Sequence, residues 1–332
     1  MGGWLWWGAV GSLMSLRYVA LMRFAISIPQ FHADGAFDPA AFGAYIHRAE
    51  ELGFESAWTG EQVLGTMPHL GPIETMTYAA ACSERIRLGC AMLILPLYSP
   101  LHLAKSLASL DQLSRGRLEI GLALGGRSRP FAAFGITPDG LAARFNESLR
   151  VIQLVWTEPR VDFEGRFWRL KGAAMEPKPF QKPYPPIWLG GSHPDALTRA
   201  VRLAAGFFGA GSQTTAQFAE QVTVVRQALA THGRDKAGFR IAKRAYVAVE
   251  DDGERARRRI AEALDRLYGY FGVKGVEAVA VAGRPEDCVR ELRQIEEAGA
   301  ELILLNPLYD DAEQMERLAS EVVPGLAPTI RS

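Results

Sequence analysis

The segment IRLGCAMLILPLYSPLHLAKSLASLDQLSRGRLEIGLALGGR, which runs from Ile86 to Arg127, decides the fold. It begins with a short apolar run rich in strand-forming residues, which predicts a buried strand from Ile86 to Leu95. Leu103, Leu107 and Leu110 then recur at helical spacing and predict one apolar helix face. A second buried strand follows, because leucine and isoleucine alternate with smaller residues between Leu118 and Leu124. Two strands joined by a helix predict a parallel βαβ unit.

The boundaries of this unit are marked by residues with known backbone preferences. Ser99 and Pro100 predict a helix start, because serine caps helix N-termini and proline is tolerated in the first turn. Gly116 is free to take the left-handed conformation that ends a helix. Gly125 and Gly126 open a loop in which the backbone can approach a ligand closely. In a closed parallel barrel, such loops after the strands form the active face.

Two phrases of this segment resemble the luciferase-like monooxygenase superfamily, the relatives of bacterial luciferase that use FMN or the deazaflavin coenzyme F-420. LGCAMLILPLYSP is similar to their third strand and its loop, and LDQLSRGRLEIGLALGG is similar to their fourth strand and glycine loop. The resemblance extends from about Met22 to about Leu326. It implies a flavin-type cofactor bound at the carboxyl ends of the barrel strands.

The remainder of the chain repeats the alternation of strand and helix. Eight strands over about 300 residues predict a TIM-like (β/α)8 barrel rather than a sandwich or a Rossmann fold. A hairpin from Val161 to Leu170 and a proline-rich connector from Pro177 to Pro186 predict an insertion between strands four and five. The expected domain is a single barrel over 22–332. Its strands are expected at 23–29, 55–59, 86–95, 118–124, 187–190, 206–209, 240–249 and 302–305.

The composition excludes several classes of protein. The chain has 332 residues, with 48% hydrophobic and 22% charged residues, as in globular proteins that do not span membranes. Lys and Arg together number 37, as do Asp and Glu, so no basic field favours nucleic acid or a membrane surface. The three cysteines, Cys82, Cys90 and Cys288, have no metal-ligand spacing, and a reducing cytoplasmic location is expected. His69, His102 and His193 also lack ligand spacing, so no metal site is predicted.

The segment 1–21 is treated apart from the barrel. It is an uncharged run as far as Arg17, shorter than a membrane span, with several glycines and no basic residues before its apolar part. Because the resemblance starts at Met22, we interpret this segment as an unstructured or misassigned N-terminal extension, with an interfacial tail as the alternative.

The resemblance assigns the cofactor phosphate to a glycine loop after strand five. Gly190, Gly191 and Ser192 follow strand five and precede a helix, where backbone N–H groups can hold an anion. The residues alone favour a tight turn with a serine cap, and the resemblance reverses that preference. Gly125, Gly126 and Arg127 form the second phosphate candidate, in which the arginine either pairs with a phosphate or is simply solvated. The chain departs from the family here, because luciferases carry an arginine at the position of Leu124 and some deazaflavin enzymes a glutamate at that of Gly126.

The resemblance also implies a non-proline cis peptide between Ala91 and Met92, forming a bulge that supports the cofactor ring. The residues alone indicate an ordinary strand interior, so this expectation rests wholly on the resemblance.

Candidate acid–base residues follow the first two strands. Glu61 and Gln62 align with a pair that in many relatives is an acidic residue and a histidine. Gln62 cannot titrate, so acid–base chemistry would fall to Glu61 or to His32. Asp111 and Arg115, four residues apart on the predicted helix, are interpreted as a structural ion pair, and so are Arg144 and Glu147.

These observations favour an oxidoreductase with a flavin-type cofactor. One mechanism is monooxygenation of a small organic substrate with reduced FMN, oxygen and a partner reductase. The other is hydride transfer with coenzyme F-420, which the phrase PPIWLGG slightly favours. The alternatives are a flavin-binding barrel without turnover and an unrelated phosphate-binding barrel enzyme. The resemblance also suggests a homodimer.

Overall fold

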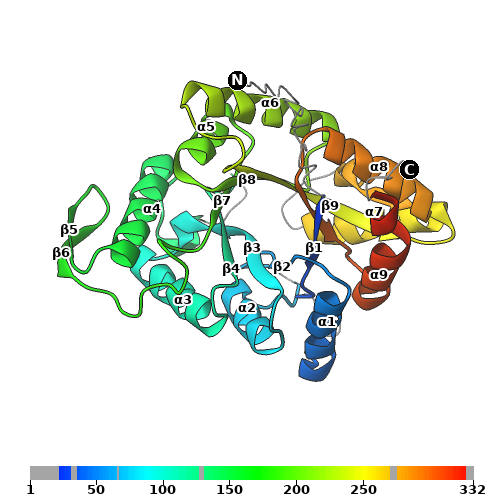
Figure 1. The fold of residues 1–332 in the computed structure, drawn as a ribbon, viewed down its shortest axis with the longest axis horizontal. Coiled ribbons are helices and arrows are strands. Elements are labelled where there is room, and N and C mark those ends of the chain that lie inside the picture. Colours follow the sequence, from blue (N-terminus) through cyan, green and yellow to red (C-terminus); the bar gives the residue numbers. More distant parts are fainter. Residues whose placement is uncertain (1–21, 31–35, 66, 127–130, 270–274, 327–332) are drawn as a thin grey trace, which may run out of the picture.

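Eight parallel strands close into a barrel, which confirms the predicted (β/α)8 fold (Figure 1). The computed structural model describes residues 22–30, 36–65, 67–126, 131–269 and 275–326. Closure follows from the first strand, which pairs in parallel with both the second and the last strand of the barrel. In spatial order the strands are β1 (Arg23–Ser27), β2 (Ser56–Thr59), β3 (Arg87–Ile94), β4 (Leu118–Ala123), β7 (Ile187–Gly190), β8 (Gly206–Gly209), β9 (Arg240–Val249) and β11 (Leu302–Asn306).

Helices surround the barrel and begin and end near the predicted positions (Figure 1). Asp38 caps the first helix, because its carboxylate accepts from the backbone N–H groups of Ala40 and Ala41. The helices are α1 (Pro39–Glu51), α2 (Pro72–Ala81), α3 (Pro100–Leu113), α4 (Leu141–Thr157), α5 (Pro194–Leu203), α6 (Thr215–Thr231), α7 (Gly253–Gly269), α8 (Pro285–Glu297), α9 (Asp311–Arg317) and α10 (Val323–Leu326). Shorter helical turns are η1 (Leu95–Leu97), η2 (Phe131–Phe134), η3 (Val276–Val279) and η4 (Leu318–Val322).

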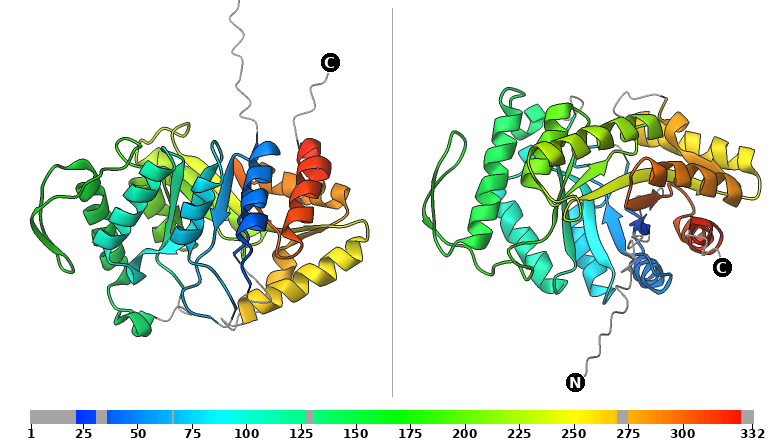
Figure 2. Two further views of the ribbon diagram at one scale, coloured as in Figure 1. Left: turned by 90° about the horizontal axis from the view of Figure 1, so that it is seen from below. Right: turned by 45° about the horizontal axis from the view of Figure 1, so that its top comes forward.

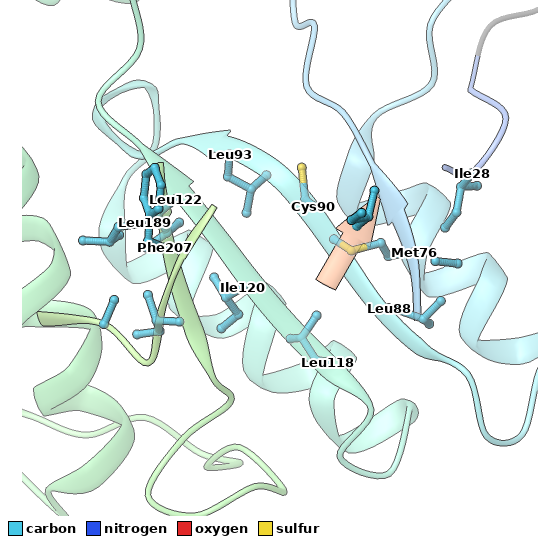
Figure 3. Packing of buried hydrophobic residues seen from close by; sticks show 14 of the residues in the cluster. Ile28, Met76, Leu88, Cys90, Leu93, Leu118, Ile120, Leu122, Leu189 and Phe207 are labelled. Carbon is cyan, nitrogen blue, oxygen red and sulfur yellow. The ribbon is translucent and has the colours of Figure 1, made fainter. Parts of the chain in front are cut away.

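The larger core lies between the barrel and its helices. Leu118, Ile120 and Leu122 project from the same face of β4 into this layer (Figure 3). Their alternation along the strand is the pattern that the sequence shows, because successive side chains of a strand point to opposite faces. Leu107 on α3 is buried in the same layer. The apolar periodicity of the 86–127 segment therefore arises because its strands and its helix pack against each other in this layer.

The barrel interior is filled by aromatic side chains. Trp58, Trp188 and Phe208 pack edge to face, with ring centroids 4.9–6.2 Å apart. The indole of Trp58 lies over Gly89, where an added Cβ would come within 2.5 Å of the ring. Glu119 accepts a hydrogen bond from the Trp188 indole nitrogen, so the polar edge of this buried ring is satisfied. A ligand is therefore excluded from the barrel interior and confined to its mouth.

Two features lie outside the eight-strand barrel. The predicted insertion is a hairpin, β5 (Val161–Glu164) and β6 (Arg169–Ala173), that projects beside α4 (Figures 1 and 2). The sequence did not predict β10 (Val281–Gly283), a short strand that pairs in parallel with the end of β9. Three residues are too few for a recognisable alternation.

The predicted ion pair between Asp111 and Arg115 is wrong. The two oxygens of Asp111 accept hydrogen bonds from the backbone N–H and the side-chain amide of Gln181, both at 2.8 Å. Asp111 is fully buried and fastens the proline-rich connector to α3. The pair Arg144 and Glu147 was misread in the same way. Glu147 accepts from the backbone N–H groups of residues 166–168 in the hairpin, and the Arg144 guanidinium lies 4.9 Å from the ring centroid of Trp168.

The structure does not test the interpretation of the N-terminal segment. The segment 1–21 lies outside the described residues, so its interpretation stays a prediction. Among the residues that are described, no helix has the length and apolar character needed to cross a membrane.

We expect Asp111→Ala to lower the free energy of unfolding by about 2–4 kcal/mol, because two donors of Gln181 lose their acceptor beside a buried site. Urea unfolding followed by circular dichroism measures this change. Arg115→Gln is the matched control and should change stability by less than about 0.5 kcal/mol. An equal loss of unfolding free energy in the two variants would contradict this account and support an ion pair between Asp111 and Arg115.

Candidate functional site

A cleft of about 420 Å³ opens at the carboxyl ends of β1, β2, β9 and β11. This is the end of a parallel barrel where active sites form. The helix α7 contributes one wall, and Figure 2 shows it in yellow, slanting away from one end of the barrel. The polar and aromatic lining residues include Gln30, Trp58, Glu61, Gln62, His69, Arg244, Tyr246, Tyr268, Asn306 and Asp311.

Arg244 connects this cleft to the opposite side of the barrel mouth. It lies on β9 and donates a hydrogen bond to the backbone carbonyl of Ala91 on β3. Its guanidinium also bonds the hydroxyl of Tyr246, which lies 2.7 Å from the hydroxyl of Tyr268 on α7. The side chain of Ser212 completes this chain of hydrogen bonds by contacting Tyr268. Burial and the neighbouring Tyr246 raise the pKa of Tyr268, so its hydroxyl stays protonated and can donate.

The backbone that Arg244 contacts is irregular. The peptide bond between Ala91 and Met92 is cis, as the resemblance implied, and the register of β3 against β4 shifts between Cys90 and Leu93. The side chain of Met92 packs against Gly190, where an added Cβ would meet its methyl group at 3.3 Å. The bulge is therefore fixed from several sides. Its role in supporting a cofactor ring stays a prediction.

Both residues predicted after strand two line the cleft. Glu61 accepts from the backbone N–H of Ile94 at 2.6 Å and from the hydroxyl of Tyr98. It therefore holds the η1 turn against the barrel mouth, a structural role that competes with the predicted acid–base role. Gln62 also lines the cleft, whereas His32 lies outside the described residues. The catalytic roles of all three residues stay predictions.

Two further titratable groups of the cleft have environments that change their protonation. Burial lowers the pKa of His69 to about 4, so its imidazole is neutral at pH 7. Burial, and secondarily the carboxylate of Asp310, raise the pKa of Asp311 to about 6. Asp311 has no ion-pair partner among the described residues. Its carboxyl is thus a group of the cleft that exchanges a proton close to neutral pH.

The predicted phosphate loops lie at the ends of β4 and β7, across the barrel mouth from the cleft. Gly125 adopts a left-handed conformation at φ 85°, and Gly126 is exposed. Leu124 packs against the main core, and Arg127 lies outside the described residues. The Ala91–Met92 bulge on β3 lies between the strands that border the cleft and β4, which leads into the first of these loops.

The second loop, Gly190 to Ser192, leads into α5. Gly191 and Ser192 are exposed, and Gly191 has a φ of 155°. The cap of α5 is His193 rather than the serine, because His193 Nδ1 accepts from the backbone N–H of Asp195 at 3.3 Å. The serine-cap interpretation is therefore wrong. The predicted phosphate-binding role of Gly190, Gly191 and Ser192 is not tested by this geometry and stays a prediction.

The sequence missed the residues that connect the two halves of the site. Arg244, Tyr246, Tyr268 and Asp311 were not among the candidates. A signal for the first was present, since Lys243 and Arg244 are adjacent cations inside an otherwise apolar strand. Within the described part of the chain, no group of three or more His, Cys, Asp or Glu residues could hold a metal ion.

A family model described as luciferase-like monooxygenase matches residues 22–273. The chain belongs to this family. The match covers strands β1 to β9 and includes every residue of the cleft described above except Asn306 and Asp311. The family match therefore includes most of the barrel and most of the residues that line the cleft.

Individual relatives divide between two cofactors. The chain is 27% identical over 325 residues to an F420-dependent glucose-6-phosphate dehydrogenase from Beutenbergia cavernae, covering 87% of this chain and 94% of the relative. It is 30% identical over 222 residues to an FMNH2-dependent dimethylsulfone monooxygenase from Pseudomonas putida, covering 65% of this chain. The chain spans 65% and 60% of the length of the first two curated relatives it matches.

Solved structures agree on the fold. The monooxygenase RslO1 from Streptomyces bottropensis superimposes with a TM-score of 0.81 at 25% identity, covering 92% of this chain and 100% of that one. Neighbours of lower identity, which show the fold alone, include enzymes named for F420 and for FMN.

The residues present fit a flavin-type ring with a phosphate-bearing side chain. Arg244 offers a partly buried cation at the cleft, and the tyrosine hydroxyls offer donors. The exposed backbone of Gly191 and Ser192 lies just before the N-terminus of α5, where an anion is favoured. Chemistry and placement are therefore consistent with one ligand extending from the cleft to this loop.

Asp311 makes stability depend on pH. Its pKa of about 6 in the folded protein exceeds the ordinary value of 3.8, so the folded state binds the proton more tightly than the unfolded chain does. The free energy of unfolding therefore falls as the pH rises through this window, and the penalty persists above it. We expect Asp311→Asn to stabilise by about 1–3 kcal/mol at pH 7.5 and by much less at pH 4.

Urea unfolding at the two pH values measures the effect. Asp265→Asn, at an exposed position on α7, is the control and should show no such difference. A gain for Asp311→Asn that is the same at both pH values would contradict the assignment.

Proposed function

We propose that the protein is an oxidoreductase that binds a deazaflavin of the F-420 type across the barrel mouth and acts on a small organic substrate in the cleft. The observation that carries this proposal is the partly buried Arg244, which lines the cleft and donates a hydrogen bond to the Ala91–Met92 bulge. The F-420 assignment is supported by the relative from Beutenbergia cavernae, because that match spans nearly the whole of both chains. When bound, such a cofactor supplies a two-electron hydride donor or acceptor.

The residues of the chain itself would bind and orient the cofactor and the substrate, and they would exclude water from the cleft. Arg244 places positive charge beside the bulge, where it would stabilise a ring that gains negative charge on reduction. Tyr246 and Tyr268 fix the guanidinium and close the cleft from the side of α7. Trp58 forms an apolar floor, since it belongs to the aromatic filling of the barrel and also lines the cleft.

A proton is also needed when hydride is exchanged with an alcohol, imine or activated alkene. The carboxyl of Asp311 suits this role because its pKa of about 6 lies near the pH of most cytoplasms. Glu61 and His32, the residues expected from the sequence, remain candidates. Each of these three residues is replaced in turn, and turnover is measured as a function of pH. The residue that transfers the proton is the one whose replacement lowers turnover and changes its pH dependence.

A binding titration of the full chain tests the cofactor. We expect F-420 to bind with a dissociation constant at least tenfold lower than that of FMN, measured by the change in cofactor fluorescence. Preference for reduced FMN would overturn the deazaflavin assignment and leave the oxidoreductase class intact. Binding of neither cofactor would overturn the proposed function itself.

We expect Arg244→Met to weaken cofactor binding by about 10- to 100-fold, because a charge-assisted hydrogen-bond donor is lost at a buried site. Arg244→Lys should retain part of the affinity, since it keeps the charge. Arg258→Met, an exposed position on α7, is the control and should bind as the unaltered protein does. Unchanged affinity in Arg244→Met would contradict the placement of the ring.

Monooxygenation with reduced FMN is the second candidate. It is favoured by the structural similarity to RslO1 and by the relative from Pseudomonas putida. This reaction would require electrons from a partner flavin reductase. Oxygen consumption that depends on both an added reductase and an organic substrate would support it. The homodimer and the cytoplasmic location expected from the sequence remain part of the proposal.

A further inference from the structure

A second, positively charged groove lies on the outside of the barrel between α4 and α5. Its volume is about 580 Å³. In the ring of helices, α3 packs closely on α4 and α5 packs closely on α6, whereas this groove separates α4 from α5 (Figure 1). The charged and polar side chains that line it are Asn146, Arg150, Gln153, Asp195, Arg199 and Arg202.

The three arginines of the groove are available to a ligand. Arg150, Arg199 and Arg202 form neither an ion pair nor a hydrogen bond with any of the residues that the structure describes. The one carboxylate of the lining, Asp195, is 84% exposed and acts on Arg199, whose pKa burial lowers and this carboxylate raises, so it offsets part of the charge of the three arginines. Three arginines against one carboxylate leave the lining of the groove with a net positive charge.

Arg199 is the most informative of these residues. Its guanidinium is half-buried and lies 5.6 Å from the ring centroid of Phe145, and this partial burial lowers its pKa. Another half-buried arginine of the same protein, Arg117, donates to the carbonyls of Ala80, Ser83 and Ile86, among other acceptors. A partly dehydrated guanidinium without acceptors is costly, and a bound anion would offset that cost.

The groove begins beside the candidate phosphate loop. The helix α5 starts at Pro194, directly after Gly190 to Ser192, and Asp195 in its first turn already lines the groove. At about 1.5 Å per residue, Arg199 and Arg202 lie roughly 7 Å and 12 Å along the helix axis from that start. A ligand with one anion at the loop and further anions along a chain would meet these arginines in succession.

We propose that this groove binds the oligocarboxylate tail that a deazaflavin coenzyme of the F-420 type carries beyond its phosphate. The proposal rests on the proposed function, and it deepens that function by assigning this chain's own residues to one cofactor class. FMN ends at its phosphate and offers nothing to the groove. Guanidinium groups pair with carboxylates through two parallel hydrogen bonds, which favours a chain of carboxylates over a single ion.

The test compares deazaflavin with a tail of several glutamates against the tail-free form, in binding titrations of the full-length protein. We expect the tailed form to bind about five- to thirtyfold more tightly, as two or three partly exposed charge pairs would give. The double variant Arg199→Gln, Arg202→Gln should lose this preference and keep the affinity for the tail-free form. Arg258→Gln is the control for a general loss of positive charge.

The outcomes separate the two proposals. Equal binding of both forms by the unaltered protein would overturn the groove proposal and leave the proposed function standing. Binding of neither form would overturn the proposed function, and the groove proposal would fall with it. Tight binding of inorganic tripolyphosphate without any gain from the glutamate tail would show an anion site for another ligand and would also overturn the proposal. Loss of tail-free binding in the double variant, despite an unchanged thermal midpoint, would do the same, because the arginines would then act outside the groove.

Discussion

Aromatic packing inside the barrel is the constraint on which the rest of the site depends. Trp58, Trp188 and Phe208 occupy the interior, and the chain accommodates them by placing glycine at 89 and 206, where the indoles lie against the backbone. Because the interior is filled, a ligand has to bind at the mouth. The Ala91–Met92 bulge packs on the same aromatic cluster, so the floor of the mouth is rigid where a flat ring would rest.

Charge is distributed unevenly over this mouth. Arg244 is held by the Ala91 carbonyl and Tyr246, while Asp311 lies at the cleft without an ion-pair partner among the described residues. The first arrangement stabilises a fixed positive charge, and the second makes a carboxyl that changes protonation near neutral pH. An oxidoreductase that moves a hydride needs both a stabilised anionic ring and a proton carrier. Under the proposed function, Arg244 and Asp311 would supply these two groups, and the raised pKa of Asp311 would lower stability at neutral pH.

The sequence predicted the barrel because its signals are local. The alternation in β4 and the Ser99-Pro100 start of α3 can each be recognised from a few neighbouring residues. The prediction of eight strands follows from local patterns of this kind. The side-chain contacts were misread where the partner is distant. Asp111 bonds Gln181, 70 residues away, although Arg115 on the same helix seemed the natural partner.

The same distance explains why the site was only half predicted. Arg244 and Ala91 are 153 residues apart in the sequence, and no local sequence pattern at either position predicts their contact. Glu61 and Gln62 were predicted because they lie just after a strand end and align with a residue pair of the family. Asp311 was missed because its pKa depends on burial by elements that the sequence cannot bring together.

A crystal structure of the full-length protein soaked with deazaflavin would show where the cofactor ring binds. We expect electron density for the ring at the mouth of the barrel, against Ala91 and Met92 and within hydrogen-bond reach of Arg244, with the phosphate at Gly191 and Ser192. A ring bound elsewhere on the barrel, or one that leaves Arg244 and the bulge untouched, would contradict it.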